Sequence, residues 1–198
     1  MTQDPIGVVL AGGGSRRMGR DKARAQLGGR PLIEWVSTAM EGAGLDVVVA
    51  GPHRPGFALP CVADAPGVGP VAGLVGAMDA FPDRDLFVAA VDQPLLRSET
   101  VAALLLVQGD LVAPLADATA QVTCAVYRPG SFRAARAALG SDDPSLQGGA
   151  RACRAVLIEE ATWRAWGEDG RSWSGIDTEE ALAEAQVRLD AEGLRSTS

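Results

Sequence analysis

The 198-residue sequence is poor in the side chains that bind metals or carry out nucleophilic catalysis. Its three cysteines, Cys61, Cys124 and Cys153, lie far apart and form no CxxC pair. An odd, scattered set argues against a disulfide framework and a zinc site, so we predict small buried thiols in a reducing cytoplasm. His53 is the only histidine and has no partner in the sequence for a metal site or a catalytic triad, so we interpret it as a loop residue.

Long apolar runs and an excess of positive charge are absent as well. The runs Leu86–Val91 and Val101–Val107 are far shorter than the roughly 20 residues that span a bilayer. Asp4 precedes a very brief apolar stretch, which is not the pattern of a signal peptide. With 25 acidic against 18 basic residues, the net charge of −7 argues against a broad nucleic-acid-binding surface. We expect a cytoplasmic protein with neither nucleic acid nor a membrane as a partner.

Lysine is almost missing too, because Lys22 is the only lysine among the 18 basic residues. It lies in the segment LAGGGSRRMGRDKA, residues 10–23. Over residues 10–24, five basic residues face the single acid Asp21: Arg16, Arg17, Arg20, Lys22 and Arg24. This local concentration of positive charge lets an acidic chain bind an anionic small molecule.

Short apolar runs alternate with helical patterns along a length that suits one domain, residues 1–198, with 192–198 as a frayed tail. The β-branched, fully apolar run 6–11 is typical of a buried parallel strand. Further strands are expected at 46–51, 60–65, 85–92, 109–115, 121–127 and 155–159. Helices are expected at 31–44, 69–81, 98–109, 131–139, 145–154 and 178–191.

This alternation predicts a single-domain, three-layer α/β/α fold with a Rossmann-like, mostly parallel sheet. Its crossovers should be right-handed, and ligands should bind at the carboxyl ends of the strands. Pro31 and Pro70 are expected at the first positions of their helices, and Ser98 is expected as an N-cap.

The glycine run 12–14 follows the first expected strand and predicts an anion-binding loop. Glycine lets the backbone approach a ligand and turn its N–H groups toward an anion. Arg16, Arg17 and Lys22 add the charge that a polyphosphate needs. The P-loop pattern GxxxxGK[ST] does not fit, because Lys22 comes three residues after Gly19 and no hydroxyl follows it. The dinucleotide pattern GxGxxG fails at Arg17, and a merely tight glycine turn is the alternative.

Two acids adjoin expected elements. Asp92, in VDQPLL, lies at the carboxyl end of an apolar strand and points over the same edge of the sheet as the glycine loop. A bound triphosphate needs a divalent cation, and Asp92 is the best single candidate ligand. Its alternative role is to cap the next helix, for which Ser98 is already available. Asp177 precedes the last helix, where it or Thr178 can serve instead as the helix cap.

The segment DAPGVGPVAG, residues 64–73, is a weaker signal. Asp64 follows a strand, and Gly67 and Gly69 precede a helix. A flat glycine surface beside an acid can admit a base or a ribose, and a plain loop is the alternative.

Three motifs together resemble a known family. LAGGGSRRMGRDKA resembles the LAGGxSxRMGxDKA signature of the molybdenum cofactor guanylyltransferases, which have the glycosyltransferase-A-like nucleotidyltransferase fold. GPVAGL is similar to their GPLAG segment and VDQPLL to their CDxPxL segment, in the same order and spacing, over residues 6–190. Related cytidylyltransferases usually have PK in place of DK, and isoprenoid and sugar nucleotidyltransferases LAAG in place of LAGG. Both differences favour the guanylyltransferase branch.

The resemblance implies an enzyme that transfers GMP from GTP to the terminal phosphate of molybdenum-molybdopterin and releases pyrophosphate. It implies Mg²⁺ as the cofactor and no side-chain nucleophile. GTP, molybdenum-molybdopterin and molybdoenzyme maturation proteins are the expected partners. Nucleotide contacts are expected from Leu10, Ala11, Gly12, Gly13, Lys22, Asp64, Gly69 and Asp92. Catalytic roles are expected for Arg17, Lys22 and Asp92, and metal ligation for Asp92 and Asp177.

Two departures from the family pattern lie on the acceptor side. Asparagines usually precede the last helix, but this chain contains no asparagine and has Gly175 and Asp177 there. A His-Pro pair is replaced by Val122 and Thr123. Two alternatives therefore stay open: a nucleotidyltransferase that uses CTP or another acceptor, of the molybdopterin cytidylyltransferase or sugar-phosphate type, and a non-catalytic nucleotide-binding relative.

Overall fold

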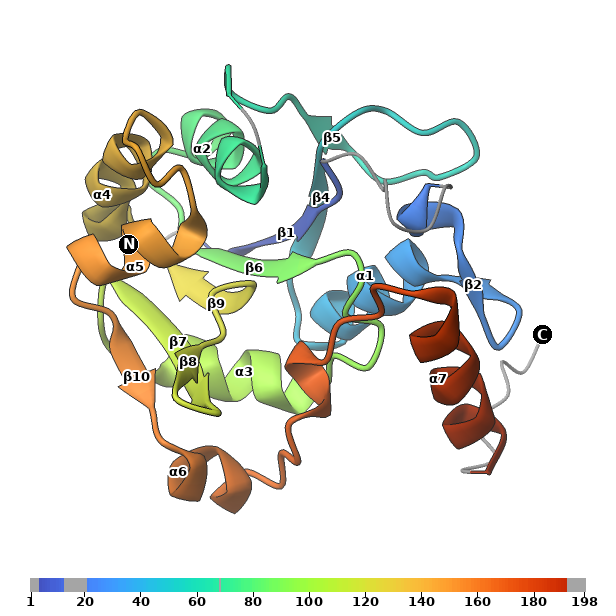
Figure 1. Cartoon of the computed structure of the whole chain (residues 1–198). Coiled ribbons are helices and arrows are strands. Elements are labelled where there is room, and N and C mark those ends of the chain that lie inside the picture. Colours follow the sequence, from blue (N-terminus) through green and yellow to red (C-terminus); the bar gives the residue numbers. More distant parts are fainter. Residues whose placement is uncertain (1–3, 13–20, 68, 192–198) are drawn as a thin grey trace.

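The computed structural model describes residues 4–12, 21–67 and 69–191, which form one α/β domain around a central sheet (Figure 1). The strands lie in the order β10-β7-β9-β6-β1-β4-β5, and β8 pairs with β7. Their bounds are β1 Ile6–Leu10, β4 Asp46–Ala50, β5 Cys61–Val62, β6 Leu86–Ala90, β7 Leu111–Ala116, β8 Thr119–Ala120, β9 Cys124–Tyr127 and β10 Val156–Ile158. A separate small hairpin consists of β2 Gln26–Leu27 and β3 Arg30–Pro31.

The sheet is mostly parallel, as the alternating pattern predicts. β1 pairs in parallel with β4 and β6, β4 with β5, and β7 with β10. The exceptions are β9, which runs antiparallel to both β6 and β7, and the short β8, which runs antiparallel to β7. Residues 117–123 join β7 to β9, and a link this short cannot make the crossover that parallel neighbours need.

Helices cover both faces of the sheet and give the expected three layers (Figure 1). On one face, a core cluster joins β1 to α2 Pro70–Ala80, α4 Pro129–Leu139 and α5 Leu146–Ala152. On the other, a second cluster joins β1 to α1 Leu32–Gly42, α3 Ser98–Leu106 and α6 Glu160–Ala165. Val8 and Leu10 belong to the first cluster and Val9 to the second, because successive side chains of a strand point to opposite faces.

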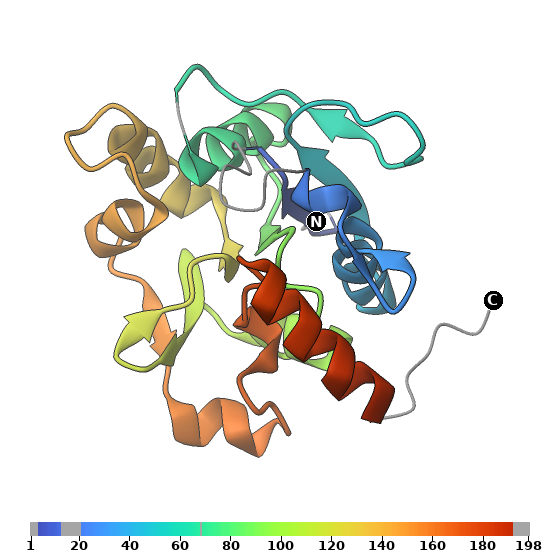
Figure 2. The same ribbon diagram turned by 45° about the vertical axis from the view of Figure 1, so that its right-hand side comes forward.

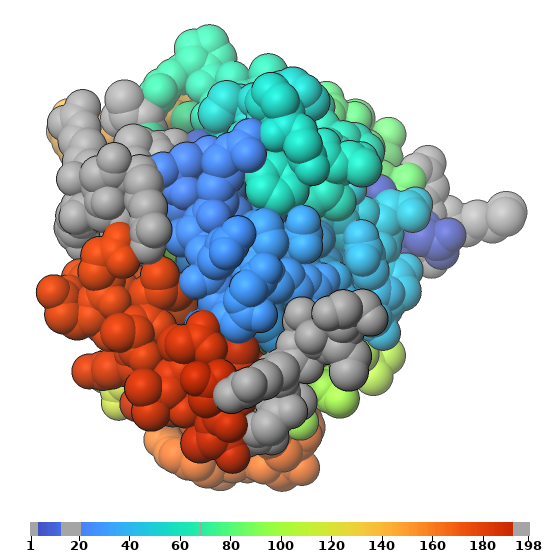
Figure 3. All heavy atoms as spheres, turned by 90° about the vertical axis from the view of Figure 1, so that its right-hand side faces the viewer, coloured from blue at the N-terminus to red at the C-terminus, as the bar shows by residue number. Residues whose placement is uncertain are grey.

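A third cluster brings the C-terminal helix to the N-terminal part of the chain. It joins Leu27 and Leu32 to Ile176, Leu182 and Leu189. α7 Glu179–Ala191 thereby lies beside β2 of the hairpin, which follows the 3-10 helix η1 Lys22–Arg24 along the chain (Figures 2 and 3). This packing carries Asp177 across the molecule to the edge of the sheet where β1 ends.

Several local predictions are wrong. Pro31 lies in β3 and precedes α1 rather than beginning it, whereas Pro70 does begin α2. Ser98 is the first residue of α3 rather than its N-cap; Arg97 holds that position without a side-chain cap bond, and the helix ends at Leu106. The elements α6, η1, η2 (Arg171–Trp173), β2, β3 and β8 were not predicted.

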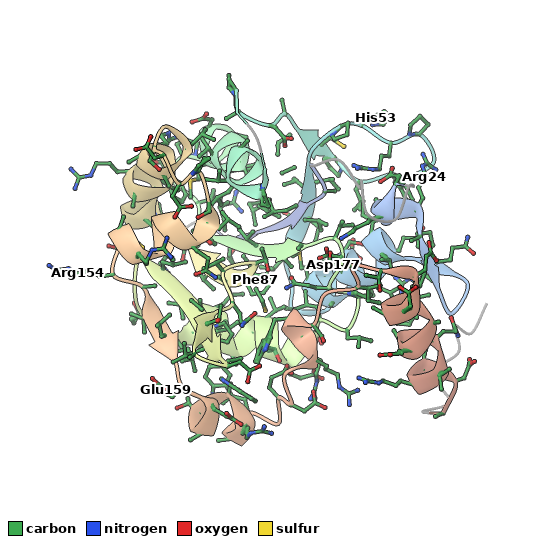
Figure 4. The ribbon with its side chains drawn as sticks, viewed as in Figure 1. Arg24, His53, Phe87, Arg154, Glu159 and Asp177 are labelled. Atoms are coloured by element: carbon green, nitrogen blue, oxygen red, sulfur yellow. The ribbon has the colours of Figure 1, made fainter. Side chains whose placement is uncertain are left out.

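The thiols follow the prediction only in part. Cys124 is buried and Cys153 half-buried, but Cys61 is exposed on the edge strand β5. All three are free. His53 is an exposed loop residue, as expected (Figure 4). Within the described ranges, no helix has both the length and the hydropathy needed to cross a membrane.

Candidate active site

The candidate site lies where the parallel strands β1 and β6 end. Leu10 is opposite Ala90 in register, so the residues that follow both strands emerge side by side. Between them is a cavity of about 220 Å³. The described residues that line it are Leu10, Ala11, Gly12, Asp21, Lys22, Ala23, Pro70, Ala90, Val91 and Asp92. Of the predicted site residues, the structure therefore brings Leu10, Ala11, Gly12, Lys22 and Asp92 to one cavity.

Lys22 joins the two predicted metal ligands. Its Nζ lies 2.9 Å from Oδ2 of Asp92 and also donates to Oδ1 of Asp177. These two acids are 70 and 155 positions away from Lys22 in the sequence. The Lys22 and Asp92 side chains are only 16% and 21% exposed, whereas that of Asp177 is 52% exposed. Two carboxylates therefore converge on one cationic group at the mouth of the cavity.

Local bonds fix both partners of this ion pair. Asp21 caps η1 by accepting a hydrogen bond from the Ala23 N–H at 3.2 Å, which orients the turn that carries Lys22. The carbonyl of Asp92 accepts from the Ile176 N–H at 2.7 Å and so holds the segment that leads to Asp177. Thr178 caps α7, because its Oγ1 accepts from the Ala181 N–H at 3.1 Å. The neighbouring Asp177, labelled in Figure 4, reaches the site, where its Oδ1 accepts from Lys22.

Burial and charge act in opposite directions on these groups. Burial raises the pKa of Asp92, although the hydrogen bond and positive charge of Lys22 oppose that rise. Burial tends to lower the pKa of Lys22, but its hydrogen bonds to Asp177 and Asp92 outweigh this effect and the pKa is raised. When all three side chains are ionised, they carry by themselves one more negative than positive charge.

The two converging carboxylates fit a magnesium ion. Mg²⁺ prefers oxygen ligands and is commonly held by one or two carboxylates, with phosphate and water oxygens completing its octahedron. Asp92 and Asp177 supply that number. Among the residues that the structure describes, no group of three or more His, Cys, Asp or Glu side chains forms a complete protein cage.

Asp64 lies against the backbone of Gly12, which lines the cavity. A Cβ at Gly12 would collide with Oδ2 of Asp64, so a larger residue there would displace this carboxylate. Burial raises the pKa of Asp64, and the nearby charge of Arg54 partly offsets this rise. Gly69 has a φ of 77° and directly precedes α2; it supports Pro70 at the cavity rather than lining the cavity itself.

Two predicted residues, Gly13 and Arg17, lie outside the described residues, as do residues 192–198.

Two buried polar residues near the site, Gln93 and Glu168, were not predicted from the sequence. Oε1 of Gln93 accepts from the Ala90 N–H at 2.9 Å, and Nε2 donates to Thr123 Oγ1 at 3.0 Å and to the Trp173 carbonyl at 3.3 Å. The sequence signal that could have identified Gln93 is its position directly after Asp92, a predicted site residue.

Glu168 was missed because its bonding partners cannot be identified from sequence. Its carboxyl group is buried and accepts hydrogen bonds from the Thr100 and Ser172 hydroxyls and from the backbone N–H of Gly170 at 2.8 Å. Gln93 and Glu168 together hold the loop before Asp177 against α3 and β6.

A larger cavity, of about 1170 Å³, adjoins this loop. Pro94 and Ser174, close in sequence to Asp92 and Asp177, lie in its wall. The wall also contains three tryptophans and four arginines, namely Trp35, Trp163, Trp173, Arg97, Arg164, Arg171 and Arg188. Four acids, Glu99, Asp117, Glu160 and Asp169, lie in the same wall, and three of the arginines are paired with acids among them. The site therefore has a small glycine-bordered cavity at Asp92 and, nearby, a large cavity whose wall is aromatic and carries both signs of charge.

Comparison with known proteins identifies the family of this chain. Residues 7–160 match the family model of the MobA-like NTP transferase domain. A probable molybdenum cofactor guanylyltransferase of Bacillus licheniformis is 38% identical over 136 residues, which cover 62% of this chain and 67% of that protein. The molybdenum cofactor guanylyltransferase of Xanthomonas euvesicatoria pv. vesicatoria is 44% identical over 101 residues, which cover 50% of this chain and 52% of that protein. The match thus spans about half the length of the latter relative.

The fold has a solved counterpart. The structure of molybdopterin-guanine dinucleotide biosynthesis protein A from Archaeoglobus fulgidus superposes with a TM-score of 0.80 at 22% identity, covering 93% of this chain and 98% of that one. The family model covers most of this chain, including β1 and β6 with the acid that follows β6. The chain belongs to the MobA-like NTP transferase family.

Proposed function

We propose that this protein is a molybdenum cofactor guanylyltransferase that transfers GMP from GTP to the terminal phosphate of molybdenum-molybdopterin and releases pyrophosphate. The observation that carries the proposal is the convergence of Lys22, Asp92 and Asp177 at the carboxyl ends of β1 and β6. The names of the two bacterial relatives support the base and the acceptor.

In this proposal the small cavity holds the nucleotide. The backbone of Leu10, Ala11 and Gly12 borders it, and Lys22 lies where its ammonium can bind phosphate oxygens. Asp64, which faces Gly12, is assigned to the nucleoside part. Gly13 and Arg17 keep their sequence-based assignments to the phosphates and the transition state.

Asp92 and Asp177 would hold the magnesium ion. When bound there, Mg²⁺ offsets phosphate charge and polarises the α-phosphorus toward attack. The protein's own contribution is positioning and electrostatics, since the acceptor phosphate is the nucleophile. The large cavity provides room for the acceptor, whose ring system suits the tryptophan faces of its wall.

The test is to incubate the protein with Mg²⁺, each of the four nucleoside triphosphates and molybdenum-loaded molybdopterin. Pyrophosphate and dinucleotide product from GTP are the expected result. Product from CTP but not from GTP would contradict the guanylyl assignment. Nucleotide binding without pyrophosphate under every condition would instead indicate a non-catalytic relative.

A further inference from the structure

Arg54 is a buried cation that no motif of the sequence identifies. It lies in the loop after β4, and its side chain is only 11% exposed. Nε donates to Oδ2 of Asp21 at 2.8 Å, and Nη2 donates to the carbonyl of Ala11 at 2.7 Å. Nη1 donates to the carbonyl of Pro52 at 3.1 Å, within its own loop.

These partners border the small cavity from two directions. Ala11 and Asp21 both line it, one just after β1 and the other just before Lys22. Asp21 uses Oδ2 for Arg54 and Oδ1 for the Ala23 N–H of η1, so bonds at both oxygens fix the orientation of its carboxylate. One guanidinium therefore connects the end of β1 to the turn that carries Lys22.

The loop that carries Arg54 is held tightly against the end of β1. Gly51 has a φ of 135°, and a Cβ there would lie 2.8 Å from the backbone nitrogen of Gly12. η1 also contacts this loop through a side chain of its own, because Arg24 donates to the carbonyl of Pro55 and lies 5.2 Å from the ring centroid of Phe57. The loop (turquoise) and the η1 segment (blue) accordingly form one continuous surface in Figure 3.

The charge of Arg54 reaches a third element of the same edge. It opposes the rise that burial causes in the pKa of Asp64, the acid that faces Gly12. Arg54 thus stabilises the ionised form of Asp64 while bonding Ala11 and Asp21. The described residues that line the cavity do not include Arg54, so its effect on a bound nucleotide would pass through these neighbours.

We infer that Arg54 is a positioning residue for nucleotidyl transfer, which holds Ala11 and the Lys22 turn at the separation that the bound triphosphate requires. This inference rests on the proposed function. Arginine suits the task because its planar group donates in several fixed directions to acceptors on separate elements. Lysine in its place keeps the charge but donates from one atom, so it cannot make the same three bonds.

The test compares Arg54→Lys with a matched control, Arg128→Lys. Arg128 is similarly buried, at 16% exposed, and its guanidinium also binds one carboxylate, Asp85, and two backbone carbonyls. Asp85 directly precedes β6, so this cluster lies at the amino end of that strand, whereas the cavity lies at its carboxyl end. Both variants should lose comparable thermal stability.

We expect kcat/KM for GTP to fall about 10- to 100-fold in Arg54→Lys, more through kcat than through KM, because misplaced phosphate ligands slow the chemical step most. Arg128→Lys should stay within about twofold of the wild type. A second comparison uses Asp21→Asn: if Arg54 acts through Asp21, the double variant should be little slower than the slower single variant.

The failures of the inference and of the proposed function are distinguishable. Equal kcat/KM for Arg54→Lys and Arg128→Lys, or fully additive effects of Arg54→Lys and Asp21→Asn, would overturn the role of Arg54 alone. A wild type that turns over CTP would correct the base, and the same comparison would then be made with CTP. A wild type that neither binds nor turns over any of the four triphosphates would overturn both.

Discussion

The two sides of the carboxylate site are constructed differently. The side proposed to bind the nucleotide (the nucleotide side) consists of residues next to elements near the end of β1, and parallel register brings them together. The side proposed to bind the acceptor (the acceptor side) is the loop before α7, which buried side chains such as Gln93 and Glu168 fasten to distant elements. Strand register places the first set of residues, whereas the second depends on individual long-range bonds, so substitutions should affect the two sides differently.

The largest effect is expected from Asp92→Ala, because Asp92 is shared by both sides. Turnover should fall roughly 100- to 1,000-fold, since the substitution removes a proposed metal ligand and a partner of Lys22. The fold should survive, as judged by circular dichroism. Asp79→Ala, which removes an exposed ion pair with Arg136, is the control. A near-normal rate for Asp92→Ala would show that the metal role is wrong.

Glu168→Gln should disturb the acceptor side alone. The new amide would place its NH2 group against groups that now donate to the Glu168 carboxyl oxygens, such as the Gly170 N–H and the Ser172 hydroxyl. The free energy of unfolding, measured by urea titration, should therefore fall by about 2 kcal/mol. The KM for the acceptor should rise while the KM for GTP stays near the wild-type value. Asp143→Asn, at an exposed ion pair with Arg151 and outside the large cavity, is the control. An equal rise in both KM values would argue against separate construction of the two sides.

Lys22→Arg tests whether charge alone serves the nucleotide side. A compact ammonium can follow phosphate oxygens, whereas a planar guanidinium is wider and prefers fixed bidentate geometry. We expect kcat to fall about tenfold in steady-state assays, with a smaller change in GTP affinity measured by titration. Unchanged turnover would show that charge is sufficient at this position.

Asp64→Asn should have the smallest effect on stability, and in the favourable direction. The pKa of Asp64 is raised by burial, so its ionised form is less stable in the folded than in the unfolded chain at neutral pH. The variant should therefore melt slightly higher than the wild type at pH 7, and the difference should vanish as the pH falls below the unfolded pKa of about 3.9. GTP binding should weaken at the same time. A lower melting temperature at pH 7 would contradict the sign.

Sequence patterns predicted the elements whose burial is strongest. The runs around Val8 and Phe87 became β1 and β6 because fully apolar, β-branched segments are stable only between two helical layers. Boundaries set by weaker terms were mispredicted: Ser98 begins α3 instead of capping it, and Pro31 enters a short hairpin. The hairpin strands are two residues each, too short for any periodic pattern to identify.

The sequence by itself determined the mostly parallel three-layer architecture and the end of the sheet at which Gly12, Lys22 and Asp92 meet, because motif residues that adjoin parallel strands lie at the carboxyl ends of those strands. Only the tertiary structure decided that Asp177 reaches Lys22 across 155 positions and that Arg54 bridges Ala11 and Asp21. Such contacts depend on how α7 and the loop after β4 pack. The packing energy is distributed over many side chains from distant parts of the sequence, so no local sequence pattern predicts these contacts.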